Sequence, residues 1–119
     1  MNGSNGRGSQ SAPPFRVILR MEIHPGSHVS FEHTWLEVGR LIALEPTNLG
    51  QVLVRSVEEE SVYYVITDWR DEPSFREFER SEAHVEHRRR LKPFRTGGQM
   101  ILTQIVYDLG GVGAAAATA

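Results

Sequence analysis

Residues 62–93 restrict the fold more than any other part of the chain. They read VYYVITDWRDEPSFREFERSEAHVEHRRRLKP. The β-branched and aromatic residues that end at Trp69 are typical of a strand, and they are followed at once by a helical pattern. Asp71 is a candidate N-cap for a short helix, and Ser81 for a second helical segment whose Val85 and Leu91 are predicted to face inward. This stretch therefore predicts a strand followed by a broken amphipathic helix.

The rest of the chain supplies the other elements in a readable order. Alternating apolar residues predict a strand over 15–23, which ends at a Pro-Gly turn. An apolar stripe at helical spacing then predicts a helix over 29–44, capped by Ser27 or Ser30. Two strands at 51–57 and 61–69, joined by three glutamates, form a predicted hairpin. The last strand is predicted over 100–109.

The order strand, helix, strand, strand, helix, strand defines the predicted fold class. Two βαβ-like halves that share one four-stranded antiparallel sheet, with the helices on one face, form the ferredoxin-like α+β arrangement. The third strand is apolar on both faces, with Tyr63, Val65 and Trp69 on one side and Tyr64 and Ile66 on the other. Since the helices cover only one face, a second copy of the sheet is expected to cover the other. We therefore predict a homodimer.

Composition limits the possible classes of function. The chain of 119 residues has a formal net charge of -2, which disfavours a nucleic-acid partner. It has no cysteine, so disulfides, thiolate metal sites and cysteine nucleophiles are excluded. No apolar run is long enough to span a membrane. These features predict a cytoplasmic protein with one folded domain over 15–109 and disordered tails at 1–14 and 110–119.

Four segments together resemble the antibiotic biosynthesis monooxygenase superfamily of dimeric α+β barrels. They are the first strand and turn RVILRMEIHPG, the DW that ends the third strand, the acidic cap at Asp71 and Glu72, and the helical SFREFERSEAHVEHRRRL. The resemblance covers nearly the whole predicted core. It implies a small dimer with one pocket per subunit between sheet and helices. The superfamily includes cofactor-free oxygenases of aromatic anthrones, haem-degrading enzymes, and proteins with neither activity, so the fold alone does not select among them.

The resemblance carries over to individual residues only in part. Trp69 stands where the family's pocket tryptophan lies. The anthrone oxygenases have an asparagine where this chain has Val65, and a tyrosine where it has Phe75. In the haem-degrading branch the axial histidine corresponds to a position near Glu79, whereas the nearest histidine here is His84, so the resemblance does not favour haem. The segment VILRM also resembles the first strand of aromatic-polyketide cyclases that share this fold.

Cofactor-free oxidation of a phenolic substrate needs an aromatic wall, a base and a group that stabilises an anion. The candidate wall residues are Trp69, Trp35, Phe75 and Phe78. For the last three an ordinary core position is the competing interpretation, and for Trp69 both interpretations are open. The indole N–H of a buried tryptophan needs a partner in either case.

Histidine, tyrosine and arginine side chains supply the candidates for proton transfer and anion binding. His84 and His87 are three residues apart on one helix, and His84 is the preferred base, with a surface or capping role as the alternative. Tyr63 shares a face with Trp69 and is the predicted pocket tyrosine. Arg20 could hold an anion, or it could form an ion pair with Glu22 or with the second subunit. No metal site is predicted, because the other histidines lie elsewhere in the order.

The sequence therefore predicts a cofactor-independent monooxygenase that oxidises an aromatic polyketide, such as an anthrone or a naphthol, to a quinone with dioxygen. In this hypothesis Trp69 orients the substrate, Tyr63 and Arg20 stabilise its anion, and His84 is the base. Two alternatives remain open: a polyketide cyclase or aromatase that uses the same pocket without oxygen, and a non-catalytic polyketide-binding accessory protein.

Overall fold

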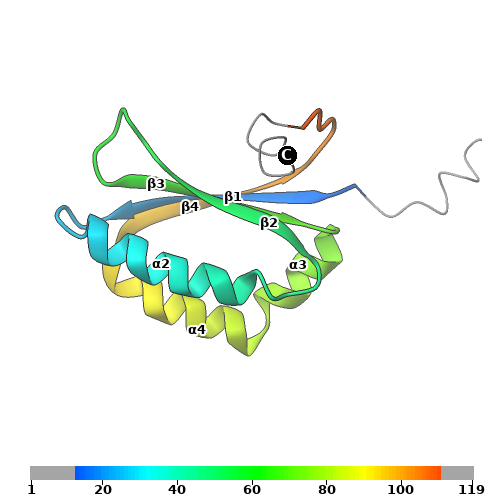
Figure 1. Ribbon diagram of the computed structural model, residues 1–119, viewed down its shortest axis with the longest axis horizontal. Helices are drawn as coiled ribbons and strands as arrows, with labels where there is room; N and C mark the ends of the chain where they lie inside the picture. Colours follow the sequence, from blue (N-terminus) through cyan, green and yellow to red (C-terminus); the bar gives the residue numbers. More distant parts are fainter. Residues whose placement is uncertain (1–12, 111–119) are drawn as a thin grey trace, which may run out of the picture.

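The computed structural model describes residues 13–110, so most of both predicted tails lies outside the described residues. Its elements follow one another in the predicted order (Figure 1). They are β1 (Phe15–Ile23), α2 (His28–Ile42), β2 (Asn48–Arg55), β3 (Val62–Trp69), α3 (Glu72–Glu79), α4 (Glu82–Leu91), the short 3-10 helix η1 (Lys92–Phe94) and β4 (Arg95–Gln104).

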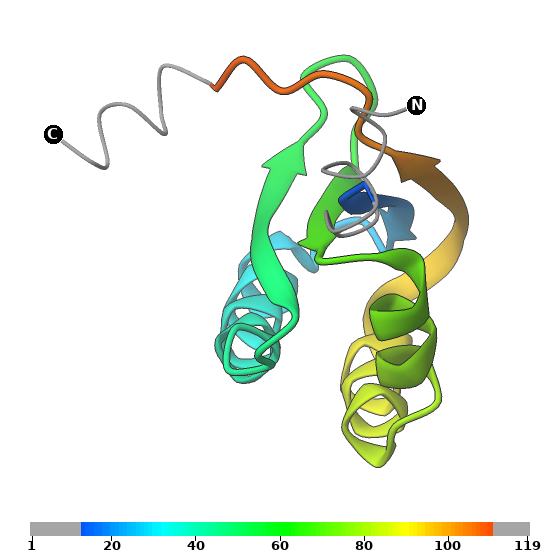
Figure 2. The same ribbon diagram turned by 90° about the vertical axis from the view of Figure 1, so that its right-hand side faces the viewer.

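The four strands form one antiparallel sheet in the order β2-β3-β1-β4. Figure 2 shows the helices on one side of this sheet, with α2 beneath the β2 end and α3 and α4 beneath the β4 end. This is the predicted ferredoxin-like α+β fold, and the prediction is confirmed. The arrangement leaves the opposite face of the sheet without a covering layer in the described chain.

The helix-side face of the sheet carries the core. In β1 the buried positions alternate, with Phe15, Val17, Met21 and Ile23 all under the helices. Two clusters form there. One gathers around Trp69, and the other around Phe31 and Tyr63.

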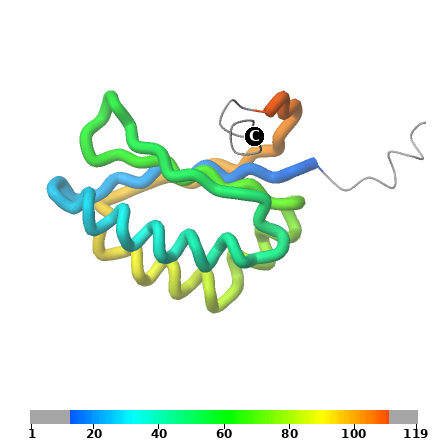
Figure 3. Tube along the Cα trace, viewed as in Figure 1, coloured from blue at the N-terminus to red at the C-terminus, as the bar shows by residue number. Residues whose placement is uncertain are grey.

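The hairpin between β2 and β3 is confirmed, although β2 begins and ends earlier than predicted. The hydroxyl of Ser56 accepts hydrogen bonds from the backbone N–H groups of Glu58 and Glu59, at 3.1 and 3.0 Å, and so closes the turn. In Figure 3 this turn rises from the sheet on the side away from the helices.

The predicted bounds of the last strand were wrong. β4 starts at Arg95 and ends at Gln104, because it pairs with β1 from Ile23↔Arg95 to Phe15↔Gln104 and stops where β1 begins. The Gly97-Gly98 pair lies inside the strand rather than before it. A Cβ at Gly98 would overlap the backbone oxygen of Arg20, so glycine permits the close approach of the two strands here.

Both predicted caps of the broken helix are confirmed. The carboxylate of Asp71 accepts a hydrogen bond from Ser74 N–H at 2.9 Å, and the Ser81 hydroxyl accepts one from His84 N–H at 3.2 Å. The predicted inward face of α4 needs a correction, because Val85 is 58% exposed. Val85 and Leu91 are six residues apart and cannot share a helix face, whereas His84 and Leu91, seven apart, can.

Candidate functional site

An apolar cavity of about 110 Å³ lies between the sheet and the helices. Residues from every helix except η1 and from three strands line it. They are Val17, Leu19, Met21, Val65, Thr67, Trp69, Arg95 and Met100 from the sheet, and Trp35, Val38, Ile42, Phe78, His84, His87, Arg88 and Leu91 from the helices.

Trp69 forms the best-anchored wall of this cavity. It is 1% exposed, and its ring lies 4.8 Å from that of Phe78 between centroids. Its indole N–H donates to the Thr67 hydroxyl at 3.0 Å, so its polar atom is satisfied within its own strand. Trp35 and Phe78 also line the cavity, as predicted for a wall. Phe75 packs behind Trp69 at 5.8 Å and is core instead.

Two histidines from α4 provide the titratable groups of the cavity. The Nδ1 atoms of His84 and His87 are buried and have no hydrogen-bond partner among the described residues. Burial lowers the pKa of His84, and the charge of Arg88 lowers it further. Burial also lowers the pKa of His87, with added contributions from His84 and Arg90. Both imidazoles are therefore neutral at pH 7 and able to accept a proton.

The break between α3 and α4 sets the position of His84 relative to the aromatic wall. Ser81 donates to the backbone oxygen of Phe78 at 2.6 Å while its hydroxyl caps α4 at His84. The rings of Phe78 and His84 then meet edge to face at 5.2 Å between centroids. Ser81 thus hydrogen-bonds to the backbone of both Phe78 and His84 and fixes their relative position.

The inner cavity continues into a more open outer hollow of about 340 Å³. Leu19, His84, Arg88, Arg95 and Met100 line both spaces. Ligand pockets usually have volumes of about 300–1,000 Å³. The inner cavity alone is too small for a fused polycycle, and the two spaces together are of suitable size.

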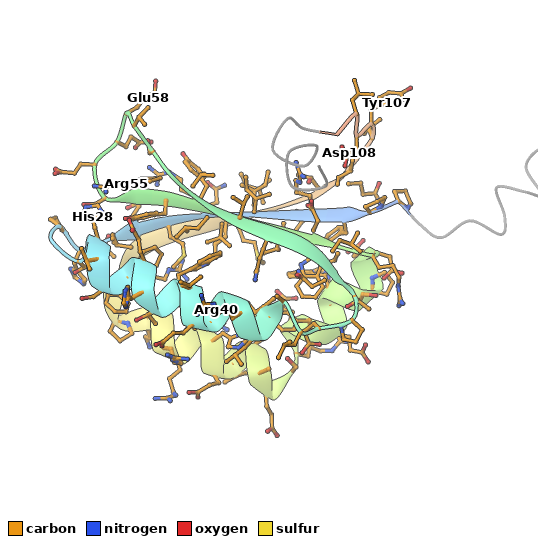
Figure 4. The ribbon with its side chains drawn as sticks, in the orientation of Figure 1. His28, Arg40, Arg55, Glu58, Tyr107 and Asp108 are labelled. Carbon is orange, nitrogen blue, oxygen red and sulfur yellow. The ribbon has the colours of Figure 1, made fainter. Side chains whose placement is uncertain are left out.

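The structure does not bring Tyr63 into this cavity. Tyr63 shares the helix-side face with Trp69, as predicted, but it lies six residues away along β3, a separation of about 20 Å. Its hydroxyl contacts the carboxylate of Glu32 and Nδ1 of His28, the latter at 2.9 Å. Burial and Glu32 raise the pKa of Tyr63 to about 12. Figure 4 shows His28 at that end of the molecule, near Arg55.

Arg20 is also absent from the cavity lining. It occupies an even position of β1, so it projects from the face opposite the helices, where the strand alternation of the sequence had placed it. There it contacts the carboxylate of Glu22 and pairs with that of Glu59 at 2.7 Å. The surroundings of Arg20 therefore match the ion-pair interpretation.

Sequence reasoning gave too little weight to three residues of the cavity. His87 is 5% exposed, although a surface role was the competing interpretation, and Arg88 and Arg95 were not proposed at all. A signal for two of them was present. His84, His87, Arg88 and Leu91 follow the i, i+3, i+4, i+7 spacing of one helix face.

Residues 13–110 contain neither a metal-binding cluster nor a membrane-spanning helix. No cluster of three or more histidine, aspartate or glutamate side chains in this range is arranged to hold a metal ion. No helix in the same range is long and apolar enough to cross a membrane.

The fold and this cavity define a class, a ferredoxin-like α+β protein with an apolar cavity between its sheet and its helices. The family model described as antibiotic biosynthesis monooxygenase matches residues 14–90. The chain belongs to this family, as the resemblance implied, and membership indicates a monooxygenase, which is an oxidoreductase.

Solved structures share the fold of this chain, and curated proteins are similar to it in sequence. SnoaB, a cofactor-independent oxygenase from Streptomyces nogalater, superposes with a TM-score of 0.73 at 21% identity, covering 84% of this chain and 100% of that one. A haem oxygenase (mycobilin-producing) from Mycobacterium tuberculosis is 28% identical over 84% of this chain and 96% of its own length. Protein SchA from Streptomyces halstedii is 26% identical over 85% of this chain but only 28% of its own length.

Proposed function

We propose that the protein is a cofactor-independent monooxygenase that oxidises a fused aromatic substrate of the polyketide type, such as an anthrone, to a quinone. The observation that carries this proposal is the juxtaposition of an aromatic wall and a neutral histidine in one apolar cavity. Trp69 and Trp35 would contact the flat faces of the substrate, and His84 would face its edge.

The proposed chemistry needs only the substrate, dioxygen and a base. His84 takes a proton from the methylene carbon next to the aromatic rings, which leaves an electron-rich carbanion. The carbanion reduces dioxygen and forms a carbon–oxygen bond. Loss of water from the resulting hydroperoxide then gives the carbonyl, so CH₂ and O₂ become C=O and H₂O. The apolar walls favour this route because they exclude water from the reacting anion.

Oxygen uptake with an anthrone substrate tests the proposal directly. The wild-type protein is expected to consume one dioxygen per quinone formed, and His84→Ala is expected to be slower by about 10²–10⁴-fold. His33→Ala is the matched control, since His33 is an exposed histidine on α2 outside the cavity. Equal rates in the wild type and His84→Ala would contradict the assigned base.

The two alternatives predicted from sequence give different results in the same assay. A cyclase or aromatase would turn over its substrate equally well under nitrogen. An accessory protein would bind the aromatic ligand without consuming either the ligand or oxygen.

We also propose that the active form is a homodimer built through the open face of the sheet. On that face Val52, Ile66, Ile18 and Ile101 lie in register across all four strands. Val52 and Ile101, on the two edge strands, are 46% and 44% exposed although they belong to this apolar row. A second copy packed on this row would bury it.

Haem is the second candidate substrate. A separate observation favours it, namely that the buried Nδ1 atoms of His84 and His87 have no partner in the described chain and could approach a metal centre. The curated relative of 28% identity adds support. A titration with haemin would test haem as the substrate. If His84 is the axial ligand, haemin binding should shift the Soret band, and His84→Ala should abolish that shift.

A further inference from the structure

Arg88 and Arg95 stand where three hollows of the surface meet. Both line the inner cavity and the outer hollow, and both line a third groove of about 470 Å³ along α4. Arg89 and Lys92 add two further cations to that groove. The mouth of the apolar cavity is therefore basic.

Within residues 13–110, carboxylates balance only part of the positive charge at this mouth. Arg89 pairs with Glu86 at 2.6 Å, and Arg90 contacts the carboxylate of Glu37. Within residues 13–110, by contrast, no carboxylate lies within ion-pair distance of Arg88, Lys92 or Arg95.

One acidic residue, Glu79, does line the outer hollow beside the two arginines. It is already engaged by Arg76, which donates to it at 3.4 Å. The mouth therefore keeps a net positive charge that a ligand could neutralise.

The backbone around Arg95 makes room for its guanidinium. A Cβ at Gly98 would overlap Nη2 of Arg95, so the glycine allows the side chain to lie against β4. Arg95 is half-buried there rather than extended into water. A half-buried guanidinium without a carboxylate partner is costly, and a planar carboxylate is the group that it binds best, through paired N–H donors.

We propose that Arg88 and Arg95 bind a carboxylate substituent of the aromatic substrate, with the rings in the cavity and the carboxylate at its mouth. This inference rests on the proposed function, and it narrows the substrate class to aromatic acids. A monoanion fits the site because the charges lie only at the rim, whereas the interior is apolar. Of the four cations that line the groove, Arg88 and Arg95 are the two that also line the inner cavity and the outer hollow.

A matched pair of ligands tests the inference without any turnover. The probes are 2-naphthoate and its neutral isostere 2-naphthamide, and their binding is measured by calorimetry at low ionic strength. Hydrogen bonds to charged groups contribute about 1.5–3 kcal/mol. The wild type is therefore expected to bind the carboxylate about tenfold or more tightly than the amide.

The variants Arg88→Gln, Arg95→Gln and the double variant should remove this preference in steps, because the carboxylate loses more binding free energy than the neutral amide does. Circular dichroism of each variant reports whether it is folded. Arg90→Gln is the control, because Arg90 lies on the same helix but lines none of the three hollows. It should keep the full preference.

Two results would overturn the inference: equal binding of both probes by the wild type, or a preference that survives in the double variant. Equal binding would leave the proposed oxygenase intact. A carboxylate preference that the double variant loses, in a protein that consumes no oxygen with any aromatic acid, would instead support this site and overturn the oxygenase. Binding of neither probe would overturn the inference, and oxygen uptake with an anthrone would test the oxygenase separately.

Discussion

The Trp69 indole donates its N–H to the hydroxyl of Thr67, two residues back on the same strand, at 3.0 Å. Both side chains line the cavity. Because the polar atom of Trp69 is already used, the ring offers a ligand its aromatic face and not a hydrogen bond. Trp69 therefore acts as a fixed wall, and Thr67 holds that wall in place.

Thr67→Val should destabilise the fold by about 1–3 kcal/mol, because it leaves a buried indole N–H without an acceptor. Urea unfolding monitored by tryptophan fluorescence measures the change. Thr96→Val is the control, since Thr96 is exposed on β4, and it should change stability by less than about 0.5 kcal/mol. Equal stability of the wild type and Thr67→Val would argue against the anchoring role.

The rate of oxygen uptake should depend on pH through His84. Burial and Arg88 lower its pKa below the ordinary value of 6.5, so the base stays neutral at pH 7 and kcat/KM should fall only below about 6.5. In Arg88→Gln the midpoint of this acid limb should rise, because a neighbouring positive charge is removed. If the acid limb of kcat/KM lay at the same pH in the wild type and in Arg88→Gln, the electrostatic coupling between Arg88 and His84 would be contradicted.

The stability of the protein should also fall in acid. The unfolded chain binds protons at His84 and His87 near pH 6.5, whereas the folded chain resists protonation until a lower pH, because both pKa values are depressed. Protons therefore favour the unfolded state. The free energy of unfolding should drop below about pH 6.5, by at most about 1.4 kcal/mol per pH unit for each histidine. The variant with both histidines replaced by glutamine should show a shallower slope in denaturant titrations across this range.

Ile66→Lys should dissociate the proposed dimer. The new charge would stand in the middle of the apolar row on the open face, where the second copy would bury it without a partner. Sedimentation velocity measures the change in mass. Val57→Lys is the control, because Val57 is fully exposed in the hairpin turn. A wild-type protein that is already monomeric at micromolar concentration would exclude the dimer.

Tyr63→Phe should leave oxygen uptake within about twofold of the wild type, because Tyr63 lies outside the cavity. The ultraviolet pH titration should differ between the two proteins only near pH 12, where the pKa of Tyr63 lies. A large loss of activity with a normal fold would restore the catalytic role first assigned to this residue.

The fold was readable from the sequence because local signals and the global arrangement agree. The strand that ends at Trp69 and the caps Asp71 and Ser81 are each signalled by nearby residues, and the structure places them as expected. The end of β4 could not be predicted from local patterns, since it depends on where β1 begins, about ninety residues earlier in the chain.

The candidate site was only partly readable. Alternation correctly puts Tyr63 on the face of Trp69, but it says nothing about distance along the strand. A polar histidine is not expected to face an apolar core, so the sequence favoured Val85 over His84 and His87 as the inward residue of α4. Arg88 and Arg95 come together only when η1 turns the chain back into β4, an arrangement that no local pattern encodes.

The break at Ser81 gives the protein a way to change its chemistry without changing its scaffold. The aromatic wall belongs to the sheet, α2 and α3, whereas the histidines and Arg88 belong to α4, and Ser81 hydrogen-bonds to both α3 and α4. An insertion or deletion there would shift α4, and with it His84, His87 and Arg88, relative to the wall while the sheet stays intact. Relatives of similar fold could therefore diverge in reaction through this one junction.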